Sequence, residues 1–367
     1  MHRKQELQKL GLKIVYINPY FDPAVPSGGN RKAKEMCTRL AEEFGSDFEL
    51  IIARGKILVG IKDAVVHEVE YKQKSIPSKI SAYLQIGKIL DSLPRSIVIM
   101  ESVPIPFGAL KKHIHFQAIW DLRYFTDNVS WLYRLKYTWP LKREWKKSQY
   151  LITCSDFTKS ELEKYCARRP EDIITSYFGF DEKLLNTTTT LPQKDFDILS
   201  VGHFEKRKNY ENLIRAIAIA DKNLKVKLIG VDNGLKVSLE NLGKELGIKN
   251  LELFTLNDDV KLWDYYRRAR LFVFPSRYEG FGMPLIEALA LGTPVACSNI
   301  SVFREIGADL PLYFNQENPE DMARVIKKSL GENRVPSREE VRKTLHKFSW
   351  DEVYRNLVDD VIAFSEK

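Results

Sequence analysis

The stretch PSRYEGFGMPLIEALALGTPV, residues 275–295, decides how this chain is expected to fold. It overlaps the apolar run RLFVFPS (270–276), which has the composition of a buried parallel strand. A glycine-containing loop follows the strand. Pro284 then suits the first turn of a helix, because a backbone N–H has no helical partner at that position. A strand, a loop and a helix in this order predict one unit of a parallel sheet covered by helices.

The loop in this stretch is the strongest candidate for a binding site. A helix N-terminus at the carboxyl end of a parallel strand offers free amides and a partial positive charge to phosphate. Gly280 and Gly282 leave room for a ligand to approach the backbone. Glu279 in the loop and Glu287 one turn inside the helix are placed to meet the sugar and the ribose of one ligand. The alternative is a plain strand–loop–helix unit with two incidental glutamates.

A second segment, DILSVGHFEKRKNYENL (197–213), follows the same logic. Its strand runs into a loop with the basic triplet Lys206, Arg207 and Lys208, and Asn209 is a candidate N-cap of the next helix. A nucleotide diphosphate leaves only when its developing charge is stabilised, and preorganised cations and amides can do this without a metal. Alone, the triplet would be typical of a solvated face.

Apolar strand-like runs alternate with amphipathic helical stretches over the whole chain, which predicts two Rossmann-like α/β domains. The polar, proline-broken stretch 186–195 marks the boundary, giving domains 1–190 and 191–349. A final helix at 350–367 is a candidate to pack back on the first domain. The predicted strands are 12–20, 48–53, 96–100, 117–121, 150–155, 196–202, 226–230, 251–256 and 270–276.

The first loop of the chain carries Gly28 and Gly29 before a predicted helix. Its amides could approach the phosphates of the same ligand from the first domain. The pair lacks the spaced three-glycine pattern of a dinucleotide fingerprint, so as a motif it is weak.

Several segments together resemble glycosyltransferase family 4, retaining enzymes of the two-domain GT-B fold that belong to the glycosyl transferases group 1. The likeness runs from residue 13 to about 330. It implies parallel sheets facing across a cleft, an acceptor-binding first domain, a donor-binding second domain, and retention at the anomeric carbon without metal or cofactor. The matching segments are PSGGNRKAKEMCTRLAEEFG (26–45), YLITCSDFTKSELEKY (150–165), GHFEKRKN (202–209) and EGFGMPLIEALALGTPV (279–295).

By position, the resemblance implies that Lys208 holds the diphosphate, that Glu287 holds the ribose, and that Glu279 and the nearby amides hold the donor sugar. The full set of residues that the resemblance implies for the donor is Gly28, Gly29, His203, Arg207, Lys208, Gly280, Phe281, Gly282, Met283 and Glu287, with Glu279 and Asp121 as catalytic residues and no metal ligands.

Two positions depart from that family. His203 stands where the family commonly has Arg, and Arg207 or Lys206 is the candidate replacement. Trp120-Asp121 stands where the family often has His-Asp with the histidine near the donor sugar. A slip of the alignment to the nearby His113 and His115 is the alternative, although the strand register favours Trp120. We otherwise interpret these two histidines as strand-edge residues.

The segment 123–150 interleaves aromatic and basic side chains, which suits an anionic membrane interface. Between residues 131 and 147 there are six cations, one acid and five Trp or Tyr residues. The alternative is an ordinary helix with its rings packed inward. If the first interpretation holds, the acceptor is lipid-linked or another cell-envelope glycan precursor. The acceptor and membrane candidates are Trp120, Arg123, Trp131 and Trp139.

Bulk composition narrows the function classes. The chain has 367 residues and a net charge of +8. Residues 1–190 hold 30 Lys and Arg against 22 Asp and Glu, so the whole excess lies there, and it indicates either an anionic partner or simple solubility. The sequence predicts no signal peptide and no membrane-spanning run, hence a cytoplasmic or peripheral protein. Its four cysteines lack close metal-ligand spacing, and no nucleic-acid-binding motif accompanies the charge.

Two other functions share this architecture. A sugar-nucleotide epimerase would need no acceptor, but it lacks the glutamate pair at this spacing. A nucleotide-sugar-binding partner subunit with weak catalysis is permitted by Trp120 and His203. Transfer or hydrolysis of the donor in vitro separates these functions from the transferase. The preferred function is transfer of a hexose from a UDP- or GDP-sugar to a glycan or lipid-linked acceptor.

Overall fold

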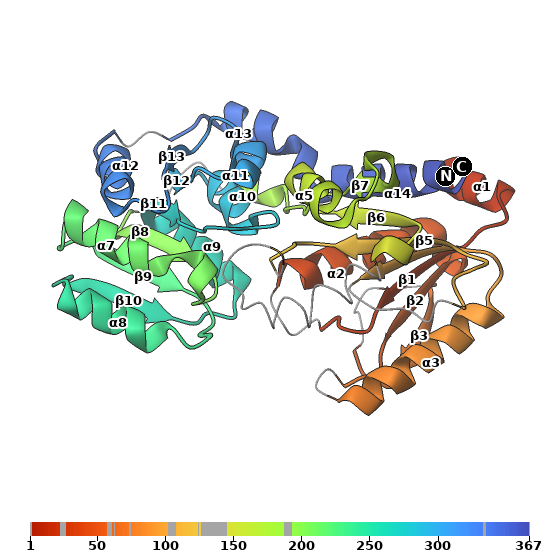
Figure 1. The fold of residues 1–367 in the computed structure, drawn as a ribbon. Coiled ribbons are helices and arrows are strands. Elements are labelled where there is room, and N and C mark those ends of the chain that lie inside the picture. The colour runs from red at the N-terminus through yellow and green to blue at the C-terminus, as the bar shows by residue number, and fades with distance from the viewer. Residues whose placement is uncertain are drawn as a thin grey trace. The chain divides into compact units, whose positions relative to one another are not determined.

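The computed structural model describes residues 2–22, 27–56, 61, 63–72, 75–101, 108–123, 125, 145–186, 193–332 and 335–366. Contacts divide the chain into two compact units, Met1–Phe178 with Trp350–Lys367, and Gly179–Ser349. Each unit is a parallel sheet covered by helices (Figure 1). The prediction of two Rossmann-like α/β domains is therefore confirmed.

The first unit is built on a seven-stranded parallel sheet in the order β3-β2-β1-β4-β5-β6-β7. Because the strand order reverses between β1 and β4, the carboxyl edge there is the topological switch point, where open α/β sheets bind ligands. The strands are β1 (Ile14–Asn18), β2 (Phe48–Ala53), β3 (Val65–Val69), β4 (Ile97–Glu101), β5 (Ile114–Ile119), β6 (Tyr150–Thr153) and β7 (Ile173–Thr175). The helices are α1 (His2–Lys9), α2 (Gly28–Phe44), α3 (Ile76–Ser92), α5 (Asp156–Cys166) and α14 (Trp350–Ser365).

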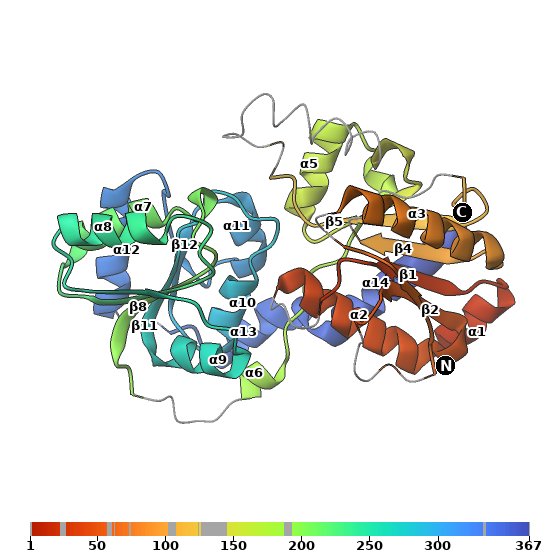
Figure 2. The same cartoon turned by 90° about the horizontal axis from the view of Figure 1, so that it is seen from below.

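Alternate strand residues point to opposite faces of this sheet, and helices bury both faces. Ile14 and Tyr16 of β1 belong to a core shared with α1, α2 and α14. Val15 and Ile17 belong to a core shared with α3 on the opposite face (Figure 2). The last helix of the chain thus completes the core of the first unit, and Arg3 of α1 pairs with Asp359 of α14.

The second unit has a six-stranded parallel sheet in the order β10-β9-β8-β11-β12-β13. Its switch point lies between β8 and β11. The strands are β8 (Phe196–Val201), β9 (Lys225–Ile229), β10 (Asn250–Phe254), β11 (Ala269–Phe274), β12 (Val295–Ser298) and β13 (Leu312–Phe314). The helices are α6 (Lys183–Asn186), α7 (Tyr210–Ala220), α8 (Lys236–Glu245), α9 (Asp259–Arg268), α10 (Met283–Ala290), α11 (Ser301–Gly307), α12 (Pro319–Glu332) and α13 (Arg338–Leu345).

Helices cover both faces of the second sheet as well. The helices α7, α8 and α12 share a core with Ile198 and Leu271 on one face. The helices α9 and α10 contact β11 from the other side (Figure 2). Among the described residues, no helix is both long and apolar enough to cross a membrane.

Most predicted strands and helices are present, and the differences concern their ends. The predicted strand 117–121 is β5, which begins earlier and ends at Ile119, so Trp120 and Asp121 follow the strand instead of belonging to it. His113 is buried before β5, and its ring Nε2 lies 3.0 Å from the carbonyl oxygen of Leu90. The predicted domain boundary at 190 lies outside the described residues.

Candidate active site

Two loops meet at the switch point of the second sheet. Strands β8 and β11 are neighbours and parallel, so the loops that follow them leave the same edge. The first loop, residues 202–209, contains a 3-10 turn at Lys206–Lys208 and leads into α7. The second loop, residues 275–282, leads into α10. These are the two segments that the sequence predicted to hold a diphosphate, and the strand order explains why they lie together.

The centre of the two loops is an ion-pair cluster around the Glu279 carboxylate. Lys208 Nζ donates to Glu279 Oε1 at 2.6 Å, and Arg207 Nη1 donates to Oε2 at 2.8 Å. The Ser276 hydroxyl donates to Oε1 at 2.8 Å. Arg207 Nη1 also donates to the carbonyl oxygen of Tyr278 at 3.1 Å, so the first loop is bonded to the second through both side chain and backbone.

The Lys208 and Glu279 side chains of this cluster are almost completely buried, which strengthens the electrostatic interaction between them. Lys208 is 7% exposed and Glu279 is 8% exposed. Burial alone would raise the pKa of Glu279, but the charges of Lys208 and Arg207 hold it at about 2. Burial lowers the pKa of Lys208, and the Glu279 carboxylate opposes that shift. We conclude that the two groups form a charged pair, because a lone charge at this depth would be neutralised.

The Lys208 ammonium is only partly used by its neighbours. An ammonium carries three N–H donors. One bonds to Glu279, and the other two have no hydrogen-bond partner in the part of the chain that the structure describes. The ammonium also lies 5.1 Å from the centre of the Phe274 ring. A buried cation with donors to spare can bind an anionic oxygen without leaving its place.

Two glycines make room for this lysine. A Cβ atom on Gly202 would lie 3.0 Å from Lys208 Cε, so a side chain at position 202 would crowd the lysine stem. Gly202 has φ +153°, which also favours glycine. A Cβ on Gly230 would lie 1.9 Å from the carbonyl oxygen of Gly202, so the neighbouring strand end must also be glycine. The sequence analysis did not single out Gly230.

The second carboxylate of the glutamate pair lies on α10 itself. Glu287 is 4% exposed and accepts a hydrogen bond from Tyr266 Oη of α9 at 3.2 Å. Pro284 occupies the first turn of α10, as predicted from its missing N–H. Gly282, which directly precedes this helix, has φ +127°.

The other predicted donor residues differ in how closely they join this cluster. Phe281 is buried and packs edge-on against Phe348, with ring centroids 5.6 Å apart. Gly280 and Met283 are partly buried beside it. His203 is exposed, and its ring Nδ1 lies 3.5 Å from the Asn233 amide, whereas Arg207 bonds to the Glu279 carboxylate.

Two details of the basic loop are visible only in the structure. Asn209 occupies the N-cap position with φ +59°, but its side chain does not cap the helix. It donates instead to the carbonyl oxygen of Gln316 at 2.7 Å, which ties the loop to the segment after β13. Lys206 is exposed, although it lies in the same basic triplet as the buried Lys208.

The remaining predicted residues belong to the first unit. Gly28 and Gly29 do not precede α2 but form its first turn, capped by the Ser27 hydroxyl, which accepts from Asn30 N at 3.2 Å. Asp121 forms an ion pair with Arg123 at 3.3 Å. Trp131 and Trp139 lie outside the described residues.

The charged residues that the pattern analysis missed lie beside Trp120. Lys32 and Glu101 are both buried. A signal for Lys32 was present, because residues 32, 36 and 40 share one helical face and the other two members are Met and Leu. Glu101 ends an apolar strand, where its carboxylate is held at the ligand-binding edge of the sheet.

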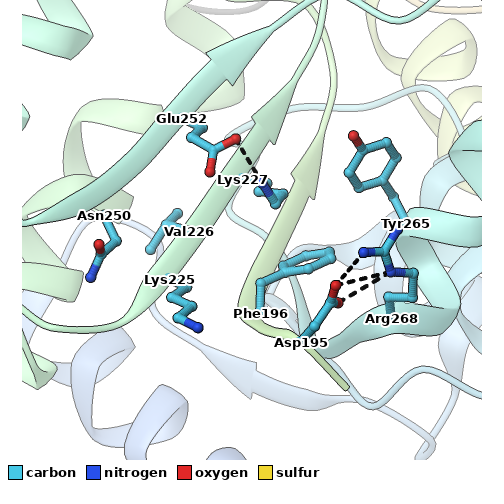
Figure 3. Close-up of a pocket in the computed structure, with 9 residues that line it drawn as sticks. All are labelled: Asp195, Phe196, Lys225, Val226, Lys227, Asn250, Glu252, Tyr265 and Arg268. Carbon is cyan, nitrogen blue, oxygen red and sulfur yellow. Dashed lines mark hydrogen bonds and ion pairs between the residues drawn. The ribbon is translucent and has the colours of Figure 1, made fainter. Parts of the chain in front are cut away.

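A cavity of about 350 Å³ lies elsewhere in the second unit, at the first residues of β8, β9 and β10 (Figure 3). It is therefore at the amino edge of the sheet, opposite the loops described above. Its charges are paired with each other: Lys227 donates to Glu252 at 2.6 Å, and Arg268 pairs with Asp195. The strand polarity and the internal pairing both argue against this cavity as the reaction site.

We expect acid to weaken the second unit through Glu279. Its pKa of about 2 lies below the ordinary 4.5, so its contribution to stability is present above pH 4.5 and is lost as the pH falls towards 2. This difference between the ordinary and the folded-state pKa corresponds to roughly 3 kcal/mol of folding stability. Urea unfolding of the wild type and of Glu279→Gln at pH 7 and pH 3 measures the free energy that the Glu279 charge contributes. The stability deficit of the variant should shrink at pH 3, and an equal deficit at both pH values would contradict the pairing.

Comparison with known proteins agrees with this architecture. A family model described as "Glycosyl transferases group 1" matches residues 182–347. An uncharacterized glycosyltransferase of Methanocaldococcus jannaschii, MJ1178, is 28% identical over 322 residues, which cover 81% of this chain and 86% of that protein. O-antigen chain mannosyltransferase B of Escherichia coli is 26% identical over 205 residues, which cover 50% of this chain and 52% of that enzyme.

A solved structure shows the same fold. The Anabaena protein Alr3699/HepE, in complex with UDP and glucose, aligns with a TM-score of 0.71 at 14% identity, covering 96% of this chain and 100% of that one. The predicted GT-B fold class is therefore confirmed.

Proposed function

Residues 182–347 belong to the glycosyl transferases group 1 family, so this chain is a glycosyltransferase, and from that premise we propose that it moves a hexose from a nucleotide diphosphate sugar to a glycan or lipid-linked acceptor. Transfer proceeds with retention at the anomeric carbon and without a divalent metal. The base is uracil or guanine, and a UDP complex of the structurally similar Anabaena protein supports uracil.

One observation supports the donor site above all others. Lys208 is a buried ammonium with unused N–H donors, at the carboxyl edge where β8 and β11 end. The first turn of α10 adds amides at the same edge. Cations and amides fixed in place before the reaction stabilise a charge that develops in the transition state, because no reorganisation is needed at that moment.

The reaction follows from this placement. The bond between the anomeric carbon and the phosphate oxygen breaks, and Lys208 with the α10 amides takes up the negative charge on the departing diphosphate. The acceptor oxygen bonds to the anomeric carbon on the same face, and its proton passes to a phosphate oxygen. Glu279 orients the donor sugar and holds Lys208 and Arg207 in position, while Glu287 binds the ribose hydroxyls.

The acceptor belongs to the first unit in this proposal. The excess of positive charge lies in residues 1–190, and that half also carries the aromatic and basic segment 123–150. A lipid-linked acceptor presented on an anionic membrane would bring substrate and surface to the same domain. The mannosyltransferase among the relatives acts on an O-antigen chain, which is a glycan of this class.

The anomeric configuration of the transferred sugar in the product tests the proposal. The protein is incubated with UDP- and GDP-hexoses and a lipid-linked acceptor in anionic vesicles, with EDTA present, and the new linkage is analysed by NMR. We expect transfer in EDTA, with the anomeric configuration of the donor kept. An inverted linkage would overturn retention, and activity that returns only with added magnesium would overturn the metal-independent mechanism.

A further inference from the structure

Polar side chains are buried at the switch point of the first sheet. Asn18 ends β1 and Glu101 ends β4, and these strands are neighbours in the sheet. Lys32 lies in the second turn of α2, the helix that follows β1. Asn18 is 5% exposed, Lys32 is 1% exposed and Glu101 is 4% exposed. The mechanism proposed above uses none of the three.

The Lys32 ammonium has three hydrogen-bond acceptors. It donates to the Ser176 hydroxyl at 3.0 Å, to the Tyr177 carbonyl oxygen at 2.9 Å and to the Ser176 carbonyl oxygen. The same ammonium lies 4.5 Å from the centre of the Trp120 ring and 5.2 Å from that of Phe178. Its three N–H donors hold the chain at 176–177, and its charge faces the indole.

Glu101 receives donors from several sides. The Tyr16 hydroxyl and the Asn18 amide donate to its carboxylate, the amide at 2.8 Å. Burial raises the pKa of Glu101 to about 7, while hydrogen bonding from Tyr16, the charge of Lys32 and the Trp120 side chain oppose that shift. Burial likewise lowers the pKa of Lys32 to about 7. Two charges at this depth cost stability compared with apolar residues of similar volume, so a role in packing alone does not account for them.

Trp120 lies against the Lys32 ammonium, and its side chain is one of the groups that affect the pKa of Glu101. It directly follows β5, at the same edge of the sheet, and it is partly buried. The Phe178 ring packs against the indole, with ring centroids 5.2 Å apart. The backbone carbonyl oxygen of Trp120 accepts a hydrogen bond from Cys154 Sγ at 2.9 Å. The indole is thus held by Lys32 on its face, by Phe178 and by its own backbone, and its side chain opposes the rise in the pKa of Glu101.

We propose that Lys32 and Glu101 are positioning residues that hold the Trp120 indole at the carboxyl edge of the first sheet, where its exposed part forms one wall of the subsite for the acceptor sugar. A flat aromatic face suits the apolar face of a pyranose, and the carboxyl edge at a switch point is where such sheets bind ligands. This inference rests on the proposed function, because it needs an acceptor.

Steady-state kinetics in a double-mutant cycle test the inference. The variants are Trp120→Leu, Lys32→Met and the combination of the two, assayed with acceptor and donor varied in turn. We expect each single variant to raise the acceptor KM about tenfold, the scale of one lost aromatic contact, and to change the donor KM less than about twofold. If Lys32 acts through Trp120, Lys32→Met adds nothing in the Trp120→Leu background.

Two further variants keep the test decisive. Lys34→Met removes an exposed lysine from the same helix and should behave as wild type. Glu101→Gln is nearly isosteric and should raise the acceptor KM even if Lys32→Met does not fold, which thermal unfolding would reveal.

The outcomes separate the two proposals. An unchanged acceptor KM in Lys32→Met and Glu101→Gln, or an equal effect of Lys32→Met with and without Trp120, would overturn the positioning role while the transferase stands. Absence of transfer by the wild type would instead count against the proposed function.

Discussion

Lys208→Met should lower kcat/KM for sugar transfer by about 10²–10³-fold, the loss seen when one preorganised charge-stabilising donor is removed from an active site. The lysine is buried, and two of its N–H donors have no partner in the described parts of the chain, so its removal takes away the cation that we propose faces the leaving diphosphate. The stabilisation that a bound nucleotide sugar gives against heat should disappear in the same variant, because that shift grows with the saturation of the site.

The matched control is Lys206→Met. Lys206 lies in the same 3-10 turn and is exposed, so its loss should change kcat/KM by less than about threefold. Lys208→Met also leaves the Glu279 carboxylate buried without its closest cation. Lys208→Met/Glu279→Gln removes both charges and tests the same point in a neutral site. A Lys208→Met protein that is folded, active within tenfold of wild type and shifted normally by donor would show that the diphosphate binds elsewhere.

Glu279→Gln should separate nucleotide binding from catalysis. The amide keeps the size of the carboxylate but loses the charge that pairs with Lys208 at 2.6 Å and Arg207 at 2.8 Å. We expect kcat to fall by about 10²-fold or more, since the donor sugar loses its orienting group. The nucleoside diphosphate without sugar should bind as tightly as before or more tightly, because its phosphates no longer compete with a carboxylate for the two cations. Isothermal titration measures that affinity.

Glu317→Gln is the control for this prediction. Glu317 forms an ion pair at 2.7 Å with Arg277, which lies in the same loop as Glu279 (residues 275–282). More than half of the Glu317 side chain is exposed. Exposed pairs of this kind contribute little, so both kcat and nucleotide affinity should stay near wild type. Parallel loss of transfer and nucleotide binding in Glu279→Gln would assign Glu279 to the nucleotide instead of the sugar.

The fold was predictable because its signals are local. Buried parallel strands such as β2 and β11 are mostly apolar runs, and the helices between them carry periodic apolar positions. The strands that escaped prediction are β3, β7, β12 and β13. Val65 and Val66 of β3 are exposed at the sheet edge, and β7 has only three residues, so neither presents a buried apolar run.

The candidate site was predictable in parts. The glycines and charges of each loop indicate a binding site in the sequence. However, Lys208 and Glu279 are 71 residues apart, and nothing in the local sequence indicates that they bind each other. The parallel pairing of β8 with β11 brings them together. Only the three-dimensional structure separates Lys206 from Lys208, because both are lysines of one triplet and their burial differs.

The contacts of Trp120 lay beyond sequence reasoning altogether. Lys32 lies 88 residues earlier in the chain, and its two backbone acceptors lie after residue 175. Local periodicity places Lys32 on the apolar face of a helix without naming a partner. The partner depends on which strand ends lie beside α2, and strand order is a property of the whole sheet.

The most direct test of the central claim is a crystal structure with a nucleotide sugar bound. We expect a pyrophosphate oxygen within about 3 Å of Lys208 Nζ, with the phosphates facing the first turn of α10 and no metal ion bridging them. A pyrophosphate held away from Lys208, or one bridged by magnesium, would contradict it.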